Sequence, residues 1–198
     1  MDPIPLFPLS RGVFPDGMLH LNIFEVRYLD MIRRCEKEGR PFGVVWLAKG
    51  SEVQVPGESP VLHGVGTLAH IRELTALQPA LLQVVCQGGQ RFILESHELG
   101  PYGVWYGKVD FLPEDTSMEI PVVLQPMADL LGQWIAEAQK QSSSGELPLF
   151  APYRLDECGW VANRWAEMLP LSNEGKLQML AENDPLARLK LAAQYVDF

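Results

Sequence analysis

The chain has 198 residues, of which 47% are hydrophobic and 21% are charged, and this composition excludes a disordered or fibrous protein. Sixteen basic and 25 acidic residues give a formal net charge of −9, divided as −2 up to Pro113 and −7 after it. Nucleic-acid binding depends on basic groups that displace counterions from phosphates, so this charge argues against a nucleic-acid partner.

Residues 1–39 contain two predicted strands and a helix. The apolar run 4–9 includes prolines, which cannot donate backbone hydrogen bonds, as is typical of an edge or barrel-closing strand. Glycines and prolines predict a loop before a second strand at 18–24. From 25 to 38 apolar residues recur every three positions, which predicts a helix with one buried stripe that ends at Gly39.

The next part of the chain, up to residue 112, reads as a series of short strands. The runs are rich in branched and aromatic residues and are separated by turn signals. They are residues 42–48, 64–74, 81–86, 92–94 and 102–112. We predict a tight hairpin at Gln87-Gly88-Gly89-Gln90, because paired glycines can adopt the positive φ values of a two-residue turn. Short strands with a single early helix indicate a small, partly open β-barrel.

The character of the sequence changes near Pro121, where helical periodicity replaces strand patterns. The spacing predicts one long helix at 121–140, a polar linker at 141–146, and a second helix at 155–169. Ser172 is a good cap for a third helix, and Asp184 followed by Pro185 is a good start for a fourth. We therefore predict an α+β protein, with a barrel subdomain at 1–118 and an α-helical subdomain at 119–198.

The run PLFPLSRGVFPDGMLHLNIFEVRY, at residues 5–28, resembles the start of the amino-terminal, substrate-binding domain of the Lon protease family. The resemblance continues through 64–67, 87–92 and 169–172, so it covers almost the whole chain. It implies a β-barrel of the PUA-like type followed by a helical subdomain. Several residues match the family signature, and we interpret them as structural. They are Phe24, Glu25, Arg27, Tyr28, Gly66, Arg91 and Phe92.

Two glycine motifs could in principle bind nucleotides, but neither has the required context. Residues 64–69 fit G-x-G-x-x-A, yet that motif must open a helix, and this stretch reads as a strand. Residues 12–17 have the spacing of a phosphate loop, but Met18 stands where lysine is needed. The histidines and cysteines lack the close, regular spacing of metal ligands. We expect no cofactor, no metal site and no catalytic residue.

The three cysteines, Cys35, Cys86 and Cys158, are odd in number and far apart, which is typical of reduced thiols in a cytosolic protein. We find no signal peptide and no run of about 18 apolar residues that could cross a bilayer. The sequence thus predicts a cytoplasmic protein without a membrane partner.

Some apolar side chains occupy positions that loop placement or strand alternation could leave exposed. They are Phe14, Pro15 and Met18 in the first loop, and Trp105 with Tyr106 in the last strand. Exposed apolar patches often mark partner sites, so these residues are candidates for polypeptide binding. Alternatively, they plug the ends of the barrel. Trp160 lies off the apolar stripe of its helix, which indicates an exposed ring.

In full-length Lon proteases this region helps to recognise unfolded or tagged polypeptides and to assemble the hexamer, whereas ATPase and peptidase activities lie in other domains. The resemblance therefore implies a free-standing, non-catalytic polypeptide-binding module, an adaptor or substrate receptor for a separate protease or chaperone machine. Two alternatives remain. One is an RNA-binding module, because PUA domains proper bind RNA, although fold does not fix function. The other is an enzyme with a small-molecule pocket in the barrel mouth.

Overall fold

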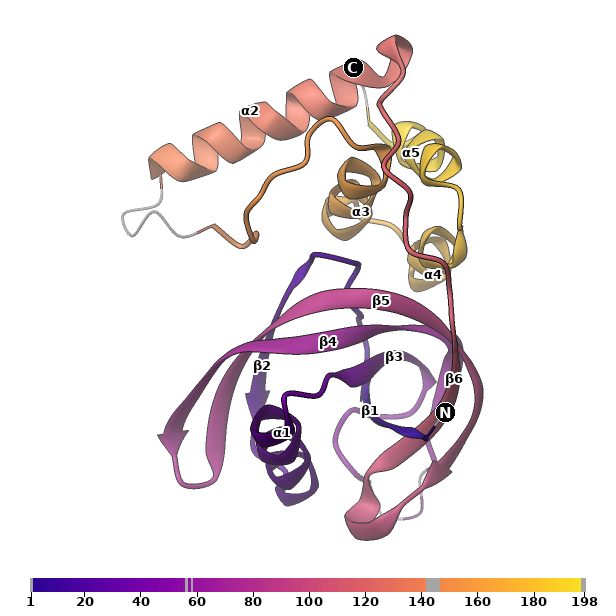
Figure 1. Cartoon of the computed structure of the whole chain (residues 1–198). Coiled ribbons are helices and arrows are strands. Elements are labelled where there is room, and N and C mark those ends of the chain that lie inside the picture. Colours follow the sequence, from indigo (N-terminus) through magenta and orange to yellow (C-terminus); the bar gives the residue numbers. More distant parts are fainter. Residues whose placement is uncertain (1, 56, 58, 142–146, 197–198) are drawn as a thin grey trace. The chain divides into compact units, whose positions relative to one another are not determined.

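The computed structural model describes residues 2–55, 57, 59–141 and 147–196, and the chain divides into two compact units, Met1–Leu112 and Pro113–Phe198 (Figure 1). The predicted boundary, after residue 118, lies later than this division. The reason is local: Asp115 pairs with Arg188, and the Met118 carbonyl accepts a hydrogen bond of 2.8 Å from the Cys158 N–H. The segment before residue 119 therefore contacts the helical unit. The linker was predicted at 141–146: Gln141 belongs to the last helical turn of α2 (Gln125–Gln141), and residues 142–146 lie outside the described residues.

Over its described residues, unit 1 is built from strands with one α-helix and one 3₁₀ turn. These are β1 (Ile4–Leu9), β2 (Met18–Ile23), α1 (Val26–Glu38), β3 (Phe42–Lys49), β4 (Val61–Gln78), β5 (Leu81–Leu99), η1 (Pro101–Gly103) and β6 (Trp105–Phe111). The predicted early strands and helix are confirmed. Gly39 ends α1 with φ of 63°, a conformation that costs glycine little.

The strands follow the order β2-β5-β4-β3-β1-β6, and β5 also pairs with β6. This extra pairing closes β5, β4, β3, β1 and β6 into a ring, and β2 is attached to β5 outside it. β1 runs parallel to β3 and antiparallel to β6, so it takes the barrel-closing place foreseen for a proline-rich strand. The predicted α+β fold with a small, partly open barrel is confirmed.

The predicted hairpin at Gln87–Gln90 is wrong, because β5 continues without a turn from Leu81 to Leu99. The glycines permit close contacts instead of a reversal: a Cβ on Gly88 would lie 2.0 Å from the Phe14 carbonyl oxygen. A Cβ on Gly89 would lie 2.5 Å from Nε2 of His70. The chain reverses earlier, at Pro79 and Ala80, between β4 and β5.

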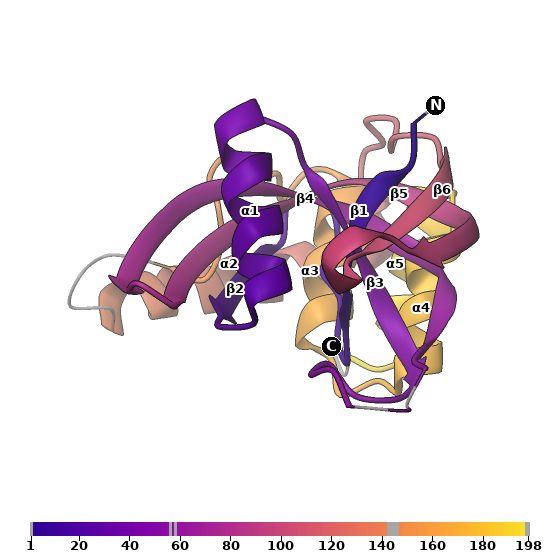
Figure 2. The ribbon, with the colours of Figure 1, turned by 90° about the horizontal axis from the view of Figure 1, so that it is seen from below.

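Two buried clusters lie among the described residues of unit 1. In the larger one, α1 packs its buried stripe, which includes Tyr28 and Ile32, against apolar residues of β1 and β2 such as Phe7 and Leu21. The smaller one lies within the ring and contains Leu6, Val45, Leu68 and Phe92. Figure 2 shows α1 crossing the long β4 and β5 ribbons. The helix thus covers the face of the sheet that carries the larger cluster.

Unit 2 is helical. It contains η2 (Val122–Leu124), α2 (Gln125–Gln141), α3 (Cys158–Met168), α4 (Asn173–Ala181) and α5 (Pro185–Ala193). Both predicted caps are confirmed: Ser172 Oγ accepts from the Gly175 N–H at 3.2 Å, and Asp184 Oδ1 accepts from the Leu186 N–H at 2.9 Å. The expected exposure of Trp160 is wrong, because its ring is 2% exposed and packs 6.2 Å from that of Tyr153.

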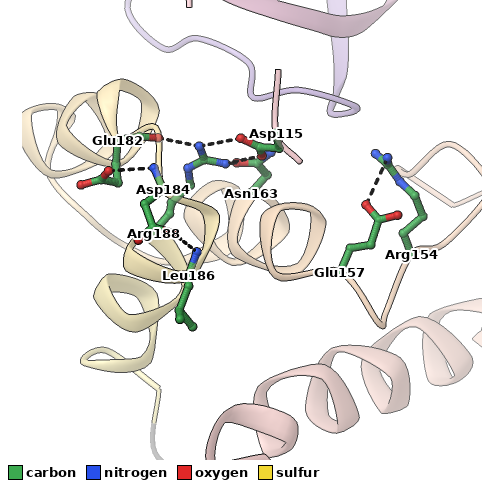
Figure 3. Close-up of polar contacts among 8 residues, drawn as sticks. All are labelled: Asp115, Arg154, Glu157, Asn163, Glu182, Asp184, Leu186 and Arg188. Atoms are coloured by element: carbon green, nitrogen blue, oxygen red, sulfur yellow. Dashed lines mark hydrogen bonds and ion pairs between the residues drawn. The ribbon is translucent and has the colours of Figure 1, made fainter. Parts of the chain in front are cut away.

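A buried arginine joins several segments of unit 2 (Figure 3). The Arg188 side chain is fully buried and donates to both carboxylate oxygens of Asp115, at 2.6 and 3.0 Å. It also donates to Asn163 Oδ1 at 3.0 Å and to the Glu182 carbonyl at 2.5 Å. Burial of a cation is tolerated only when it is paired and hydrogen-bonded, and this network meets that condition.

Candidate functional site

The first loop does not present Phe14 to solvent. Its side chain is 1% exposed, so the expectation of an exposed Phe14 is wrong. The loop folds onto β5, where the Gly17 N–H donates to the Phe14 carbonyl at 2.9 Å and the Asp16 N–H donates to the Gly88 carbonyl at 2.8 Å. Pro15 and Met18 are half-buried. Phe14 therefore belongs to the interior of unit 1.

Trp105 and Tyr106 are both half-buried and adjacent on β6, so their side chains point to opposite faces of the sheet. Trp105 packs against the cluster within the ring and lies edge-on to His97, with ring centroids 5.4 Å apart. Tyr106 packs against the cluster that α1 covers. The aromatic candidates therefore do not form one patch, and their role in binding stays a prediction.

The signature residues at the start of α1 form a clamp. Arg27 Nη1 donates to the Gly103 carbonyl at 3.0 Å, and Nη2 lies 3.1 Å from Glu25 Oε2. Its guanidinium sits 4.4 Å above the ring of Tyr28, which in turn stacks on Phe7 at 4.1 Å. Arg27 thereby ties the amino-terminal end of α1 to η1.

The same clamp holds the β3–β4 loop. Glu25 Oε2 accepts from the Gln54 N–H at 3.3 Å, and Glu52 Oε1 accepts from the Ser10 N–H at 2.6 Å. Both carboxylates are therefore engaged. Burial raises the pKa of Tyr28 to about 12, so its phenol remains neutral at physiological pH.

The other signature residues support the barrel itself. A Cβ on Gly66 would lie 2.5 Å from the Phe92 ring and 2.6 Å from the Val44 carbonyl oxygen, so these strands can approach only at glycine. Arg91 is 2% exposed, and its carbonyl accepts from the Leu112 N–H at 2.9 Å where unit 1 ends. These contacts are consistent with a structural role.

Beside the clamp lies a groove between β1 and β2, with a cavity volume of about 180 Å³, which we name the β1–β2 groove. Its walls are apolar and its rim carries polar and charged groups. The lining includes Phe7, Leu9, Leu19, Leu21, Ile23 and Tyr28, with Arg11, His20, Asn22, Phe24, Glu25, Glu52 and Val53 around them.

A smaller pocket of about 90 Å³ shares Tyr28, Glu52 and Val53 with this groove and is also lined by Val55, Leu99 and Trp105. Large apolar side chains are exposed around both. They are Phe24 at 57%, Val53 at 47%, Val55 at 44% and Leu99 at 55%, and we name them the apolar rim. Sequence reasoning did not mark Phe24 as exposed, although the alternation of buried Leu19, Leu21 and Ile23 places its side chain outward.

The groove is suited to apolar contacts more than to proton or metal chemistry. Within the described residues, no group of three or more histidine, cysteine or acidic side chains is placed to hold a metal ion. Burial raises the pKa of Cys35 to about 11 and that of Cys86 to about 12, so neither thiol ionises at neutral pH. The glycine motif at 64–69 lies inside β4, which leads into β5 and not into a helix.

The helices in the described segments are short or carry polar and charged residues. None of them combines the length and the apolar character required to cross a bilayer.

Known structures share this fold. The Lon N-terminal domain protein from Xanthomonas campestris is similar over 100% of both chains, with a TM-score of 0.77 and 27% sequence identity. The N-terminal domain of the Mycobacterium avium complex Lon protease matches 98% of this chain and 97% of that domain, with a TM-score of 0.60 and 15% identity. At that identity, the second likeness concerns the fold alone.

A curated relative is longer than this chain. The Lon protease of Brevibacillus choshinensis is 24% identical over 193 residues, which cover 95% of this chain but 24% of the protease. The chain thus spans about a quarter of that relative's length.

The family match covers nearly every residue. Residues 3–197 match the description "ATP-dependent protease La (LON) substrate-binding domain", which confirms the resemblance seen in the sequence. The chain therefore belongs to the ATP-dependent protease La (LON) substrate-binding domain family.

Proposed function

We propose that this chain is a non-catalytic module that binds unfolded or tagged polypeptide through the β1–β2 groove and the apolar rim. The observation that carries the proposal is the match of residues 3–197 to a substrate-binding domain. In this proposal the module acts in the cytoplasm as an adaptor or substrate receptor for a separate protease or chaperone machine.

The surface around the clamp supports the proposal. Phe24 and Val53 expose about half of their side chains beside the groove, although burial would stabilise them. Exposed apolar side chains that gather beside a cavity and are rimmed by charges are typical of partner sites. The clamp of Glu25 and Arg27 fixes the loop that carries Val53, so the rim keeps its shape without a partner.

The test is a fluorescence-anisotropy titration of labelled, permanently unfolded polypeptide. Phe24→Asp and Val53→Asp each place a charge in the contact, and we expect about tenfold weaker binding for either variant. Leu77→Asp is the matched control, because Leu77 is 52% exposed and lines neither pocket. Equal affinities for the wild type and all three variants would reject the groove as the binding site.

The non-catalytic part of the proposal needs a separate assay. Purified protein is incubated with peptide, casein and ATP, and we expect no hydrolysis of any of them. Turnover that a single point substitution abolishes would contradict the proposal, because contaminating enzymes would not respond to such a change.

A further inference from the structure

β2 is an edge strand whose free side faces the β1–β2 groove. It pairs with β5 over Met18–Ile23, and in the described part of the chain no other strand pairs with it. All residues from Leu19 to Ile23 line the groove. An unpaired strand edge presents a row of backbone donors and acceptors, and such edges are natural templates for another extended chain.

The register identifies which groups face outward. The Gly88 N–H donates to the Gly17 carbonyl at 2.9 Å, so this pair is hydrogen-bonded. The register continues without a shift from Met18 to Ile23, and in an antiparallel ladder hydrogen-bonded and non-hydrogen-bonded pairs alternate. Leu19, Leu21 and Ile23 therefore bond to β5, whereas His20 and Asn22 direct their N–H and C=O groups to the groove.

The facing wall comes from β1. This strand pairs with β6 only over Ile4–Leu6, and its continuation, with Phe7 and Leu9, lines the groove. The wall is thus apolar, while the β2 side offers main-chain hydrogen bonds. That combination matches an extended polypeptide, whose main chain can pair with one wall while alternate side chains contact the other.

The charges at the groove specify the occupant further. Glu25 is engaged by Arg27 and by the Gln54 N–H, and Glu52 by the Ser10 N–H. Arg11 also lines the groove, its side chain is exposed, and none of the described residues forms an ion pair or hydrogen bond with it. The Ser10 N–H is a neutral donor and leaves the charge of Glu52 in place, so the groove carries both signs of charge. Arg11 is the lining cation without an ion-pair partner among the described residues, and it complements a carboxylate locally.

We propose that an extended, apolar polypeptide segment binds as an added strand on the edge of β2 and places a carboxylate against Arg11. This inference rests on the proposed polypeptide-binding function and deepens it, because it specifies main-chain recognition and the charge of the bound segment.

The first test uses peptides and leaves the protein unchanged. The probe is a fluorescent peptide of about six residues, the usual length of a strand, with alternating valine and threonine and a carboxy-terminal aspartate. Two further versions are N-methylated, one at the valines and one at the threonines. Side-chain alternation fixes the register, so only one set of peptide amides faces β2. We expect the peptide that is methylated on that set to bind about tenfold more weakly, and the other methylated peptide to bind like the unmodified one.

The second test changes the edge itself. Asn22→Pro removes one outward N–H at a position where an edge strand tolerates proline, and Asn22→Thr changes the side chain but keeps that N–H. We expect Asn22→Pro to weaken peptide binding and Asn22→Thr to leave it unchanged. Arg11→Glu should invert the preference between peptides that end in aspartate and in lysine, whereas Arg40→Glu, at a site outside the groove, should not.

The outcomes separate this inference from the proposed function. If both methylated peptides bind as well as the unmodified one, and Phe24→Asp still weakens binding, strand addition is rejected while polypeptide binding stands. If unfolded polypeptide does not bind at all, the proposed function is rejected as well. A concentration-dependent dimer in sedimentation that Asn22→Pro abolishes would assign the edge to a second copy of this chain and overturn the inference.

Discussion

At the scale of single residues, Gly88 shows how a missing side chain positions the first loop. It lies in the middle of β5, and the backbone of Phe14 passes directly over it. We expect Gly88→Ala to lower the free energy of unfolding by about 2 kcal/mol or more, because the obstacle is backbone and cannot rotate away. Chemical denaturation measures this change.

The matched control is Gly64→Ala. Gly64 is exposed in β4, and a Cβ there would meet no atom within 4 Å. The substitution should leave stability nearly unchanged or raise it slightly, since alanine restricts the unfolded chain more than glycine does. Equal destabilisation by both substitutions would show that the loop does not pack on Gly88 as described.

The buried tyrosine and cysteine side chains of unit 1 are weak acids, and they predict a loss of stability at alkaline pH. Burial raises the pKa of Tyr28 to about 12, of Cys86 to about 12 and of Cys35 to about 11. Because the folded state favours their protonated forms, this stabilisation is complete below the unfolded pKa values and is lost as pH rises towards 12. Thermal unfolding followed from neutral to alkaline pH measures it.

Tyr28→Phe removes one of these ionisable groups and keeps the ring that stacks on Phe7. The variant should show a shallower alkaline loss of melting temperature than the wild type. An identical pH profile for the two proteins would mean that Tyr28 does not contribute to the loss.

At the scale of elements, the network of Arg188 fastens the segment before α2 to α3 and α5 (Figure 3). Asp115→Ala would leave a buried guanidinium without its counterion, and we expect a loss of about 3 kcal/mol of unfolding free energy. Arg40→Ala is the control, because the Arg40 side chain in its pair with Glu38 is 78% exposed, and such pairs contribute little. Denaturant titration followed by helical circular dichroism compares them, and equal stability of both variants would contradict this role.

The helix ends that depend on capping residues could be predicted from the sequence, because a cap acts on neighbouring residues. Gly39, Ser172 and Asp184 act through contacts a few residues away, and each does so in the structure. The glycines at 88 and 89 led to a wrongly predicted hairpin, because a tight turn and a close backbone contact both require glycine. The Asp115–Arg188 pair joins residues 73 positions apart, so no local pattern reveals it.

The site was less predictable than the fold for the same reason. The family signature marked Glu25, Arg27 and Tyr28, but not what they contact, because the Gln54 partner of Glu25 and the Gly103 partner of Arg27 come from distant segments. Phe14 and Trp160 were expected at the surface because loop placement and helical period say nothing of the segments that cover them. The groove itself arises from strand pairing, which local patterns do not specify.

At the scale of the whole molecule, the net charge of −9 predicts which polymers the protein avoids. A polyanion gains little from a surface with few uncompensated cations, so we expect no binding of single-stranded or duplex RNA even at low salt. A mobility-shift titration tests this expectation. Tight RNA binding there would favour the alternative of an RNA-binding PUA-like module.

The closure of the ring has a consequence for biosynthesis. Ile4–Leu6 of β1 pair with Trp105–Gly107 of β6, so the opening strand meets its last partner only after a hundred or so further residues have been made. Until then, a nascent chain on the ribosome exposes the proline-rich strand along that edge. The prolines have no N–H to donate, so they limit pairing of this exposed edge with other chains before β6 is made.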